Sequence, residues 1–319
     1  MQRRTRTTNP AVDVENLGKT YPGGVEAVKG VSFAVAPGEV FGLLGPNGAG
    51  KSTTVGMLTT TVRPTAGTAR LMGHDVVDDP IGARSVSAVV FQEATVDRAL
   101  TGRRNLEVHG RLWGVDARLA GAVIDEVLTA FGLAEVAGRN VESYSGGQRR
   151  RLEIARSLVS APRVLFLDEP TVGLDPRIRF ELLDLIAGLR ARWDTTVVLT
   201  THYLDEAERL CDRVAIVHEG RIVALDTPAK LLADLGGHLV ELRVDGDARA
   251  ALAKLRARGL AGDDAFVVGA TLTVPIHERS SRQTVAAIAD LDVATGGISA
   301  RPPTLDDVYL RLTGDRLAA

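Results

Sequence analysis

One segment combines glycines, a lysine and a serine at a spacing suited to phosphate binding. Residues 45–52, G-P-N-G-A-G-K-S, fit the pattern G-x-x-x-x-G-K-[ST]. Glycines let consecutive backbone N–H groups face one anion, Lys51 supplies a charge for the β- and γ-phosphates, and Ser52 offers a hydroxyl to Mg²⁺. The alternative is a glycine-rich turn that only caps a helix. We predict nucleotide binding by Gly45, Pro46, Asn47, Gly48, Ala49, Gly50, Lys51, Ser52 and Thr53.

A second segment could present a helix N-terminus to an anion. Residues 145–148 are S-G-G-Q, and an arginine-rich amphipathic stretch follows them. Ser145 and Gln148 have the spacing of a capping box, so the segment could simply begin a helix. Two consecutive glycines, Gly146 and Gly147, are more than a helix start needs, because each costs about 1 kcal/mol relative to alanine in a helix. Their lack of side chains would let an anion approach the bare N–H groups, which favours anion binding. The residues alone leave both interpretations open.

Two carboxylates follow an apolar segment at residues 164–169, V-L-F-L-D-E. Asp168 stands at a strand end, where P-loop enzymes place a Mg²⁺ ligand. Glu169 beside it could polarise an attacking water. The alternative is a core strand that leaves through a polar D-E-P turn.

The apolar pattern predicts the elements that must position these residues. A buried strand at 39–44 should lead into the glycine loop, and a helix should begin near Lys51. Strands alternating with helices indicate a parallel α/β sheet. The further expected elements are period-2 strands around 12–14 and 31–35, strands at 164–167 and 196–200, helical character over 97–135 and a helix around 177–192.

The pattern changes near Gly236-Gly237, so we predict a first domain at 1–236 and a second at 237–319. The second domain is expected to be a small α+β unit. Its predicted strands lie at 239–244, 265–268, 271–275 and 293–299, and its predicted helices at 248–258, 280–290 and 304–313.

Composition excludes several classes of protein. Of 319 residues, 45% are hydrophobic and 24% charged, as in ordinary globular proteins, and the net charge of −2 gives no indication of nucleic acid binding. The single cysteine, Cys211, excludes an intrachain disulfide, and the six scattered histidines do not suggest a zinc site. The basic start lacks the apolar segment of a signal peptide, and no apolar run approaches the roughly 20 residues that span a bilayer. We therefore expect a cytoplasmic chain that does not cross a membrane by itself.

The phosphate loop, S-G-G-Q and L-D-E-P, in this order, resemble the ABC (ATP-binding cassette) ATPases over roughly residues 11–232. The resemblance implies an α/β P-loop NTPase fold with a mixed-sheet core and a helical subdomain, and ATP and Mg²⁺ as ligands. It implies Glu169 and His202 as catalytic residues and Ser52, Gln92 and Asp168 as metal ligands. The remaining implied nucleotide contacts are Tyr21 on the adenine, Gln92, Asp175 in the loop that crosses a dimer interface, and Ser145, Gly146, Gly147 and Gln148.

Three further stretches resemble the daunorubicin-resistance type of drug-export ATPase. They are Tyr144, where leucine is usual in the wider family, the segment R-R-R-L-E-I-A, and the ending P-P-T-L-D-D-V-Y-L-R-L-T-G. This resemblance implies an ATP-hydrolysing motor subunit on the cytoplasmic face of the cell membrane, attached to a separate membrane permease. It also implies a head-to-tail homodimer in which each ATP lies between one phosphate loop and the partner's S-G-G-Q helix. The cargo stays open, and the 238–319 unit could stabilise the dimer, dock a subunit or sense a small molecule.

Three other functions were weighed. An ABC protein acting on ribosomes or DNA usually has a second cassette or a long coiled coil, and the sequence has neither. A nucleotide-binding regulator without turnover is disfavoured by the intact Glu169 and His202. A P-loop GTPase is disfavoured because the N-K-x-D guanine-recognition motif is missing.

Overall fold

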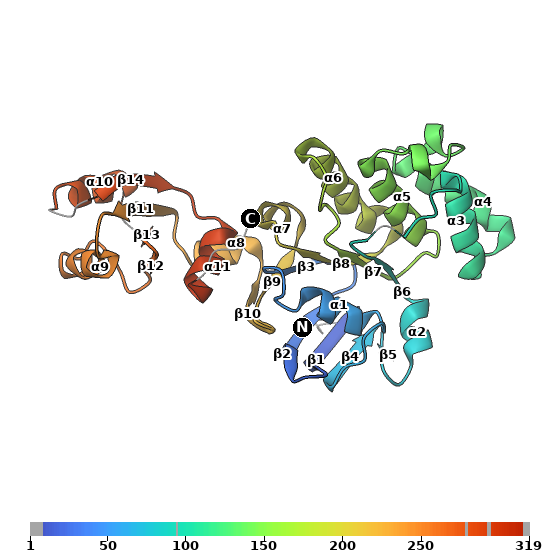
Figure 1. The fold of residues 1–319 in the computed structure, drawn as a ribbon, viewed down its shortest axis with the longest axis horizontal. Coiled ribbons are helices and arrows are strands. Elements are labelled where there is room, and N and C mark those ends of the chain that lie inside the picture. The colour runs from blue at the N-terminus through green and yellow to red at the C-terminus, as the bar shows by residue number, and fades with distance from the viewer. Residues whose placement is uncertain (1–8, 94, 278–279, 292–294, 315–319) are drawn as a thin grey trace, which may run out of the picture. The chain divides into compact units, whose positions relative to one another are not determined.

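The computed structural model describes residues 9–93, 95–277, 280–291 and 295–314, and the chain divides into two compact units between Ala224 and Leu225. This division lies upstream of the predicted boundary at 236/237. The reason is helix α8 (Pro228–Ala233), which packs against the C-terminal helix α11 (Leu305–Thr313) and so belongs to the second unit. Figure 1 labels the elements of both units.

The first unit has a six-stranded sheet among its described residues, in the order β10-β9-β3-β8-β7-β6 (Figure 1). The pairings β9–β3, β3–β8, β8–β7 and β7–β6 are parallel, which confirms the predicted parallel sheet, although among its strands only β3, β7 and β8 were predicted. All residues of β3, β7 and β8 are buried, because parallel strands are covered on both faces. The strands are β3 (Val40–Leu44), β6 (Ser87–Val90), β7 (Val164–Asp168), β8 (Thr196–Thr201), β9 (Arg213–His218) and β10 (Arg221–Asp226).

A four-stranded antiparallel sheet in the order β2-β1-β4-β5 also belongs to this unit. The alternation of valines predicted β1 and β2, whereas β4 and β5 were not predicted. Helix α1 (Lys51–Leu58), which follows the phosphate loop, contacts β2, β4 and β7 and thereby touches both sheets. The antiparallel strands are β1 (Val12–Tyr21), β2 (Val25–Val35), β4 (Ala66–Leu71) and β5 (His74–Asp75).

Three helices of the first unit, α3, α4 and α5, contact one another and form the expected helical subdomain (Figure 1). Each begins at a side-chain cap, Thr101, Asp116 or Ser145, which accepts a hydrogen bond from a backbone N–H of the first turn. No described helix is both long enough and apolar enough to span a bilayer. The helices of this unit are α1, α2 (Pro80–Ser85), α3 (Gly102–Leu112), α4 (Ala117–Ala130), α5 (Gly146–Leu158), α6 (Pro176–Trp193) and α7 (Leu204–Leu210), with 3-10 turns at Ala134–Val136 and Val141–Ser143.

The second unit is the expected α+β unit. Its sheet has the order β12-β13-β11-β14 with antiparallel pairings, and its elements follow the chain order β-α-β-β-α-β. One sheet face packs on the helices through a cluster that includes Val240, Leu242, Leu255, Val274 and Ile288. The elements are β11 (His238–Val244), α9 (Ala248–Ala257), β12 (Phe266–Val268), β13 (Thr271–Ile276), α10 (Ser281–Ala289) and β14 (Thr295–Arg301), together with α8 and α11.

Candidate nucleotide-binding site

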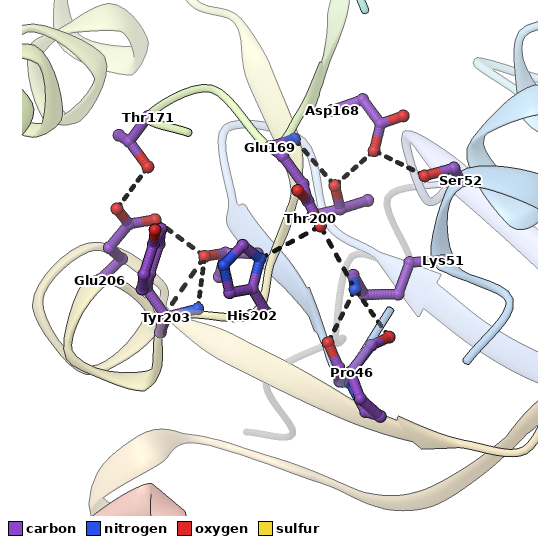
Figure 2. Close-up of polar contacts among 12 residues, drawn as sticks. Pro46, Lys51, Ser52, Asp168, Glu169, Thr171, Thr200, His202, Tyr203 and Glu206 are labelled. Atoms are coloured by element: carbon purple, nitrogen blue, oxygen red, sulfur yellow. Dashed lines mark hydrogen bonds and ion pairs between the residues drawn. The ribbon is translucent and has the colours of Figure 1, made fainter. Parts of the chain in front are cut away.

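Three neighbouring parallel strands bring the predicted reactive residues to one edge of the sheet. Strand β8 lies between β3 and β7, with Thr201 opposite Leu44 and Thr200 opposite Asp168. The phosphate loop follows β3, Glu169 follows β7 and His202 follows β8. In open α/β sheets the carboxyl ends of adjacent strands form the usual ligand site. Figure 2 shows these side chains together.

The glycines of the phosphate loop have distinct tasks. Gly48 and Gly50 have φ angles of 83° and 102°, in the left-handed region that favours glycine. A Cβ on Gly45 would lie 2.2 Å from the carbonyl oxygen of Val217, so this position tolerates no side chain. A Cβ on Gly48 would meet nothing within 4 Å, and this open side is where an anion can approach the backbone.

Lys51 is buried, with its side chain folded back onto its own loop. Its Nζ donates to the carbonyl oxygens of Gly45 at 2.7 Å and Pro46 at 3.0 Å and lies 3.5 Å from Oε1 of Glu169 (Figure 2). Burial lowers the pKa of Lys51, and the neighbouring Glu169 opposes this shift. The ammonium group is therefore held against the backbone of the phosphate loop, next to the Glu169 carboxylate.

Asp168 joins the phosphate loop to the end of β8. Its Oδ1 accepts from Ser52 Oγ at 3.1 Å and from Thr200 Oγ1 at 2.5 Å (Figure 2). The described residues contain no group of three or more His, Cys, Asp or Glu side chains placed to hold a metal. A hydroxyl and a carboxylate at this distance nevertheless suit Mg²⁺, which in nucleotide sites takes one or two protein oxygens and completes its shell with phosphate and water.

Glu169 has a backbone conformation that is rare for a residue other than glycine, with φ of 45°. Such conformations cost about 1–3 kcal/mol and gather at functional sites. Its backbone N–H donates to Thr200 Oγ1 at 2.9 Å, and its Oε1 lies 3.3 Å from Nδ1 of His202. This conformation directs the carboxylate toward both His202 and Lys51.

Glu206, from α7, forms hydrogen bonds to residues close to Glu169 and His202 in the sequence. It is fully buried and accepts from Thr171 Oγ1 at 2.5 Å and from Thr201 Oγ1 at 2.8 Å (Figure 2). Nε of Arg179 lies 2.7 Å from its Oε1. Burial raises the pKa of Glu206, and the two hydroxyl donors and Arg179 counteract this shift.

The S-G-G-Q segment begins helix α5 with the capping box that its spacing indicated. Ser145 N donates to Gln148 Oε1 at 2.9 Å, and Gln148 N donates to Ser145 Oγ at 3.2 Å. A Cβ on Gly147 would lie 2.4 Å from Cγ2 of Ile178, so packing against α6 explains this glycine. A Cβ on Gly146 would meet nothing within 4 Å, and no packing contact explains that glycine. Among the described residues, no hydrogen bond or ion pair joins this segment to the phosphate loop.

Comparison with known proteins supplies the family. A family profile described as "ABC transporter" matches residues 28–172. The chain is 44% identical over 308 residues to the daunorubicin resistance ATP-binding protein DrrA3 of Streptomyces coeruleorubidus, covering 96% of each protein. The chain belongs to the ABC transporter family.

Two further similarities agree with this ABC assignment. The daunorubicin/doxorubicin resistance ATP-binding protein DrrA of Streptomyces peucetius is 42% identical over 319 residues, with 95% of this chain and 92% of that protein covered. A dimeric post-hydrolysis ATP-binding cassette bound to ADP and Pi has the same fold, with a TM-score of 0.61 and 26% identity, covering 68% of this chain and 98% of that one. The chain is thus an ATP-binding, ATP-hydrolysing subunit, homologous to the ATPases of drug-resistance exporters.

Three residues that the ABC resemblance implied lie outside the cluster around Lys51. Tyr21 ends strand β1, is 37% exposed and has Nζ of Lys19 5.1 Å from its ring centroid. Gln92 is exposed, and no hydrogen bond in the described part of the chain joins it to Ser52 or Asp168. Asp175 is the N-cap of α6 and accepts from Ile178 N at 3.1 Å.

Two residues that organise the ABC site were not predicted from the sequence. Thr200 bridges the Asp168 side chain and the Glu169 backbone, and a hydroxyl at the end of an otherwise apolar strand was the available signal. Arg150 donates to the carbonyl oxygens of Phe91 and Pro170. The sequence offered only its i,i+3 spacing to Glu153, inside a run of three arginines.

Proposed function

We propose that two copies of this ABC ATPase face head to tail and hold each ATP between the phosphate loop of one copy and the S-G-G-Q helix of the other. The observation that carries the proposal is the open start of α5. Gly146 leaves it uncovered, and no hydrogen bond or ion pair within the described ranges joins it to the phosphate loop of its own chain. The positive end of a helix dipole and its free N–H groups suit an anion supplied with a second copy.

Within one such site the phosphate loop binds the β- and γ-phosphates. ATP exchanges the present contacts of Lys51 with Gly45, Pro46 and Glu169 for contacts with phosphate oxygens, so that the ammonium neutralises the anion. Tyr21 stacks on the adenine through its exposed ring. Asp175 lies in the loop that crosses to the partner copy.

Glu169 is the general base of hydrolysis. A water attacks the γ-phosphorus, the bond to the bridging oxygen breaks, ADP leaves with the electron pair, and the water proton passes to the Glu169 carboxylate. His202 lies 3.3 Å from that carboxylate, where it orients Glu169 and reaches the γ-phosphate. Thr200 holds the backbone of Glu169 in place during this step.

Ser52 and Asp168, together with Gln92, are the residues that would hold Mg²⁺. The ion would neutralise phosphate charge when bound. The Ser52 and Asp168 side chains already share a hydrogen bond, so their oxygens are preset near one point of the site.

This ATPase is the motor of an exporter. It lies on the cytoplasmic face of the membrane and drives export through a separate membrane permease. Membership of the ABC transporter family supports the permease as a partner, and no described helix of this chain is suited to span a bilayer. The surface around Gln92 is the contact that we assign to the permease. Because two relatives are named for daunorubicin resistance, we assign a drug of that kind as the cargo. The 237–319 domain stabilises the dimer or docks a subunit.

Mixing two inactive variants tests the shared site. In a heterodimer of Lys51→Ala and Gly146→Asp, one site combines both defects and the other combines the intact phosphate loop with the intact S-G-G-Q helix. A 1:1 mixture should recover about a quarter of wild-type ATPase activity, because half of the random dimers are mixed and each has one intact site. No recovery above the separate variants would contradict the head-to-tail arrangement.

Co-expression with a candidate permease encoded by a neighbouring gene tests the transport role. Wild-type chain should sediment with membranes and lower daunorubicin accumulation, whereas Glu169→Gln should sediment but not lower accumulation. Glu93→Lys with Arg98→Glu should release the chain from membranes. Unchanged accumulation with the wild-type pair would contradict the drug assignment, and unchanged sedimentation of the charge-reversed variant would contradict the assigned contact surface.

A further inference from the structure

A buried ion pair lies between two loops that the proposed mechanism uses separately. Arg150 is 8% exposed and Glu153 is 2% exposed, and Arg150 Nη1 lies 2.9 Å from Glu153 Oε2. Both stand on α5, one and two turns beyond its start at Gly146. Buried charges persist in proteins when they are paired and hydrogen-bonded, and this pair meets both conditions on two sides.

On one side, Arg150 donates hydrogen bonds to the backbone around Glu169, the proposed catalytic carboxylate. Its Nε donates to the carbonyl oxygen of Pro170 at 2.8 Å, and its Nη2 lies 3.0 Å from that of Asp168 and 3.3 Å from that of Glu169. The planar guanidinium can serve several acceptors at once with fixed geometry. The peptide groups on both sides of Glu169, whose φ is 45°, are thereby held.

On the other side, the pair forms hydrogen bonds to Phe91 and Thr95, which flank Gln92 in the sequence. Arg150 Nη1 donates to the carbonyl oxygen of Phe91 at 2.7 Å, and Glu153 Oε1 accepts from Thr95 N at 2.9 Å. Arg156, one turn further along α5, donates to the carbonyl oxygen of Thr95 at 2.8 Å. Phe91 and Thr95 are therefore both hydrogen-bonded to α5, and Gln92, between them in the sequence, is exposed.

We propose that Arg150 and Glu153 are a positioning pair that couples Phe91 and Thr95 to the Asp168–Pro170 backbone and so sets the orientation of Glu169 for hydrolysis. The coupling deepens the proposed function and rests on it, since Glu169 is the general base there. A shift of Phe91 or Thr95, on the surface assigned to the permease, moves the guanidinium. The same guanidinium donates a hydrogen bond to the carbonyl oxygen of Glu169. Movement of the guanidinium therefore changes the orientation of the Glu169 carboxylate. The physical link is one rigid group with acceptors in both loops.

The test compares Arg150→Gln, Arg150→Lys and Glu153→Gln with the matched control Arg151→Gln in the full-length chain. Arg151 is the next residue of the same helix and pairs with Glu181, and in the part of the chain that the structure describes no hydrogen bond or ion pair joins it to either loop. The measurements are the ATP affinity, the turnover per ATP-binding site, the thermal unfolding midpoint, and amide hydrogen exchange in peptides covering 91–98 and 166–172.

The pair variants should lose about 10- to 100-fold in turnover per binding site with ATP affinity nearly unchanged, because misplacement of a catalytic group by about 1 Å costs this much. Arg150→Lys retains the charge opposite Glu153, so it should stay folded, but one ammonium cannot replace a fork that donates to four carbonyls. Glu153→Gln should speed exchange in the 166–172 peptide, although among the described residues no hydrogen bond or ion pair joins Glu153 to that segment. Arg151→Gln should match the wild type in every measurement except a small change in the unfolding midpoint.

Unchanged exchange of 166–172 in Glu153→Gln, or unchanged turnover per site in Arg150→Lys, would overturn the coupling. A loss of turnover that tracks only the unfolding midpoint would also overturn it, since a purely structural pair would act that way. Failure of the proposed function is detected separately by Glu169→Gln. If that variant hydrolyses ATP normally, Glu169 is not the base, and the exchange measurement alone then decides whether the two loops are coupled.

Discussion

The Nζ atom of Lys51 lies 3.5 Å from Oε1 of Glu169, so the phosphate-loop ammonium and the carboxylate after β7 form an ion pair. Both groups are buried, and Lys51 also donates to two carbonyl oxygens of its own loop. In the mechanism proposed above, ATP displaces this pairing when it brings phosphate oxygens to Lys51. The Glu169 carboxylate then becomes free to accept a proton from water, so nucleotide binding would prepare the proposed base.

Lys51→Ala should weaken ATP binding by about 10- to 100-fold or more, because a charge-assisted contact to phosphate is worth about 1.5–3 kcal/mol. Isothermal titration calorimetry with ATP measures the change. Lys254→Ala, in helix α9 of the second unit, removes the same charge away from the site and is the control. Equal affinity of wild type and Lys51→Ala would refute the assignment of the phosphate loop.

Glu169→Gln should bind ATP but hydrolyse it about 10²- to 10⁴-fold more slowly, because a general base contributes this much. The uncleaved ATP should hold two copies together, so light scattering after size exclusion should report a dimer only with ATP. Glu135→Gln, in a surface turn, should behave as wild type. A Glu169→Gln variant that turns over normally and stays monomeric with ATP would be incompatible with the role given to this residue.

The two glycines of S-G-G-Q should respond differently to substitution. Gly146→Asp adds a carboxylate in open space at the helix start, so it should abolish hydrolysis through repulsion of phosphate while the chain stays folded and binds one ATP. Gly147→Ala should instead lower the unfolding midpoint, because its Cβ would lie 2.4 Å from Ile178 Cγ2. Ile178→Ala combined with Gly147→Ala should recover part of the loss. Identical behaviour of the two single variants would argue against this division of tasks.

Thr200→Val should reduce turnover and stability together. The buried hydroxyl both donates to Asp168 Oδ1 and accepts from Glu169 N, and an unpaired buried N–H costs about 1–3 kcal/mol. Steady-state kinetics and urea unfolding measure the two effects. Thr200→Ser keeps the hydroxyl and should retain most of both properties, so an equally damaged serine variant would point to packing of the methyl group as the cause.

His109 should make the first unit sensitive to mild acid. Burial, aided by nearby Arg156, lowers its pKa from 6.5 to about 4, so between these values the unfolded chain binds a proton that the folded chain does not. Stability is therefore complete above pH 6.5 and falls as the pH drops, with a loss of about 2 kcal/mol at pH 5. Fluorescence of Trp113 and Trp193, the only tryptophans, reports urea unfolding of wild type and His109→Gln. Parallel pH profiles for the two proteins would exclude His109 as the source.

Chemistry carried by neighbouring residues could be predicted from the sequence. Three features depend on groups only a few residues apart, so their spacing can be read directly from the sequence. They are the phosphate loop, the capping box at Ser145 and the strand that ends at Asp168. The apolar period likewise predicted the parallel sheet and the elements of the second unit other than α8. No strand was predicted for β6, β9 or β10, nor for β4 and β5, whose exposed and small residues give little apolar signal.

Contacts between distant residues were decided only by the tertiary structure. Three arginines follow S-G-G-Q, and only the rotation and packing of α5 select Arg150 to enter the site, 20 residues from Pro170 and 59 from Phe91. Gly147 differs from Gly146 only because Ile178 of another helix packs on it. Spacing along the chain specifies which groups can act together within a turn or a strand end. Which side chain fills the space between two loops depends on the close packing of segments that the sequence order does not place side by side.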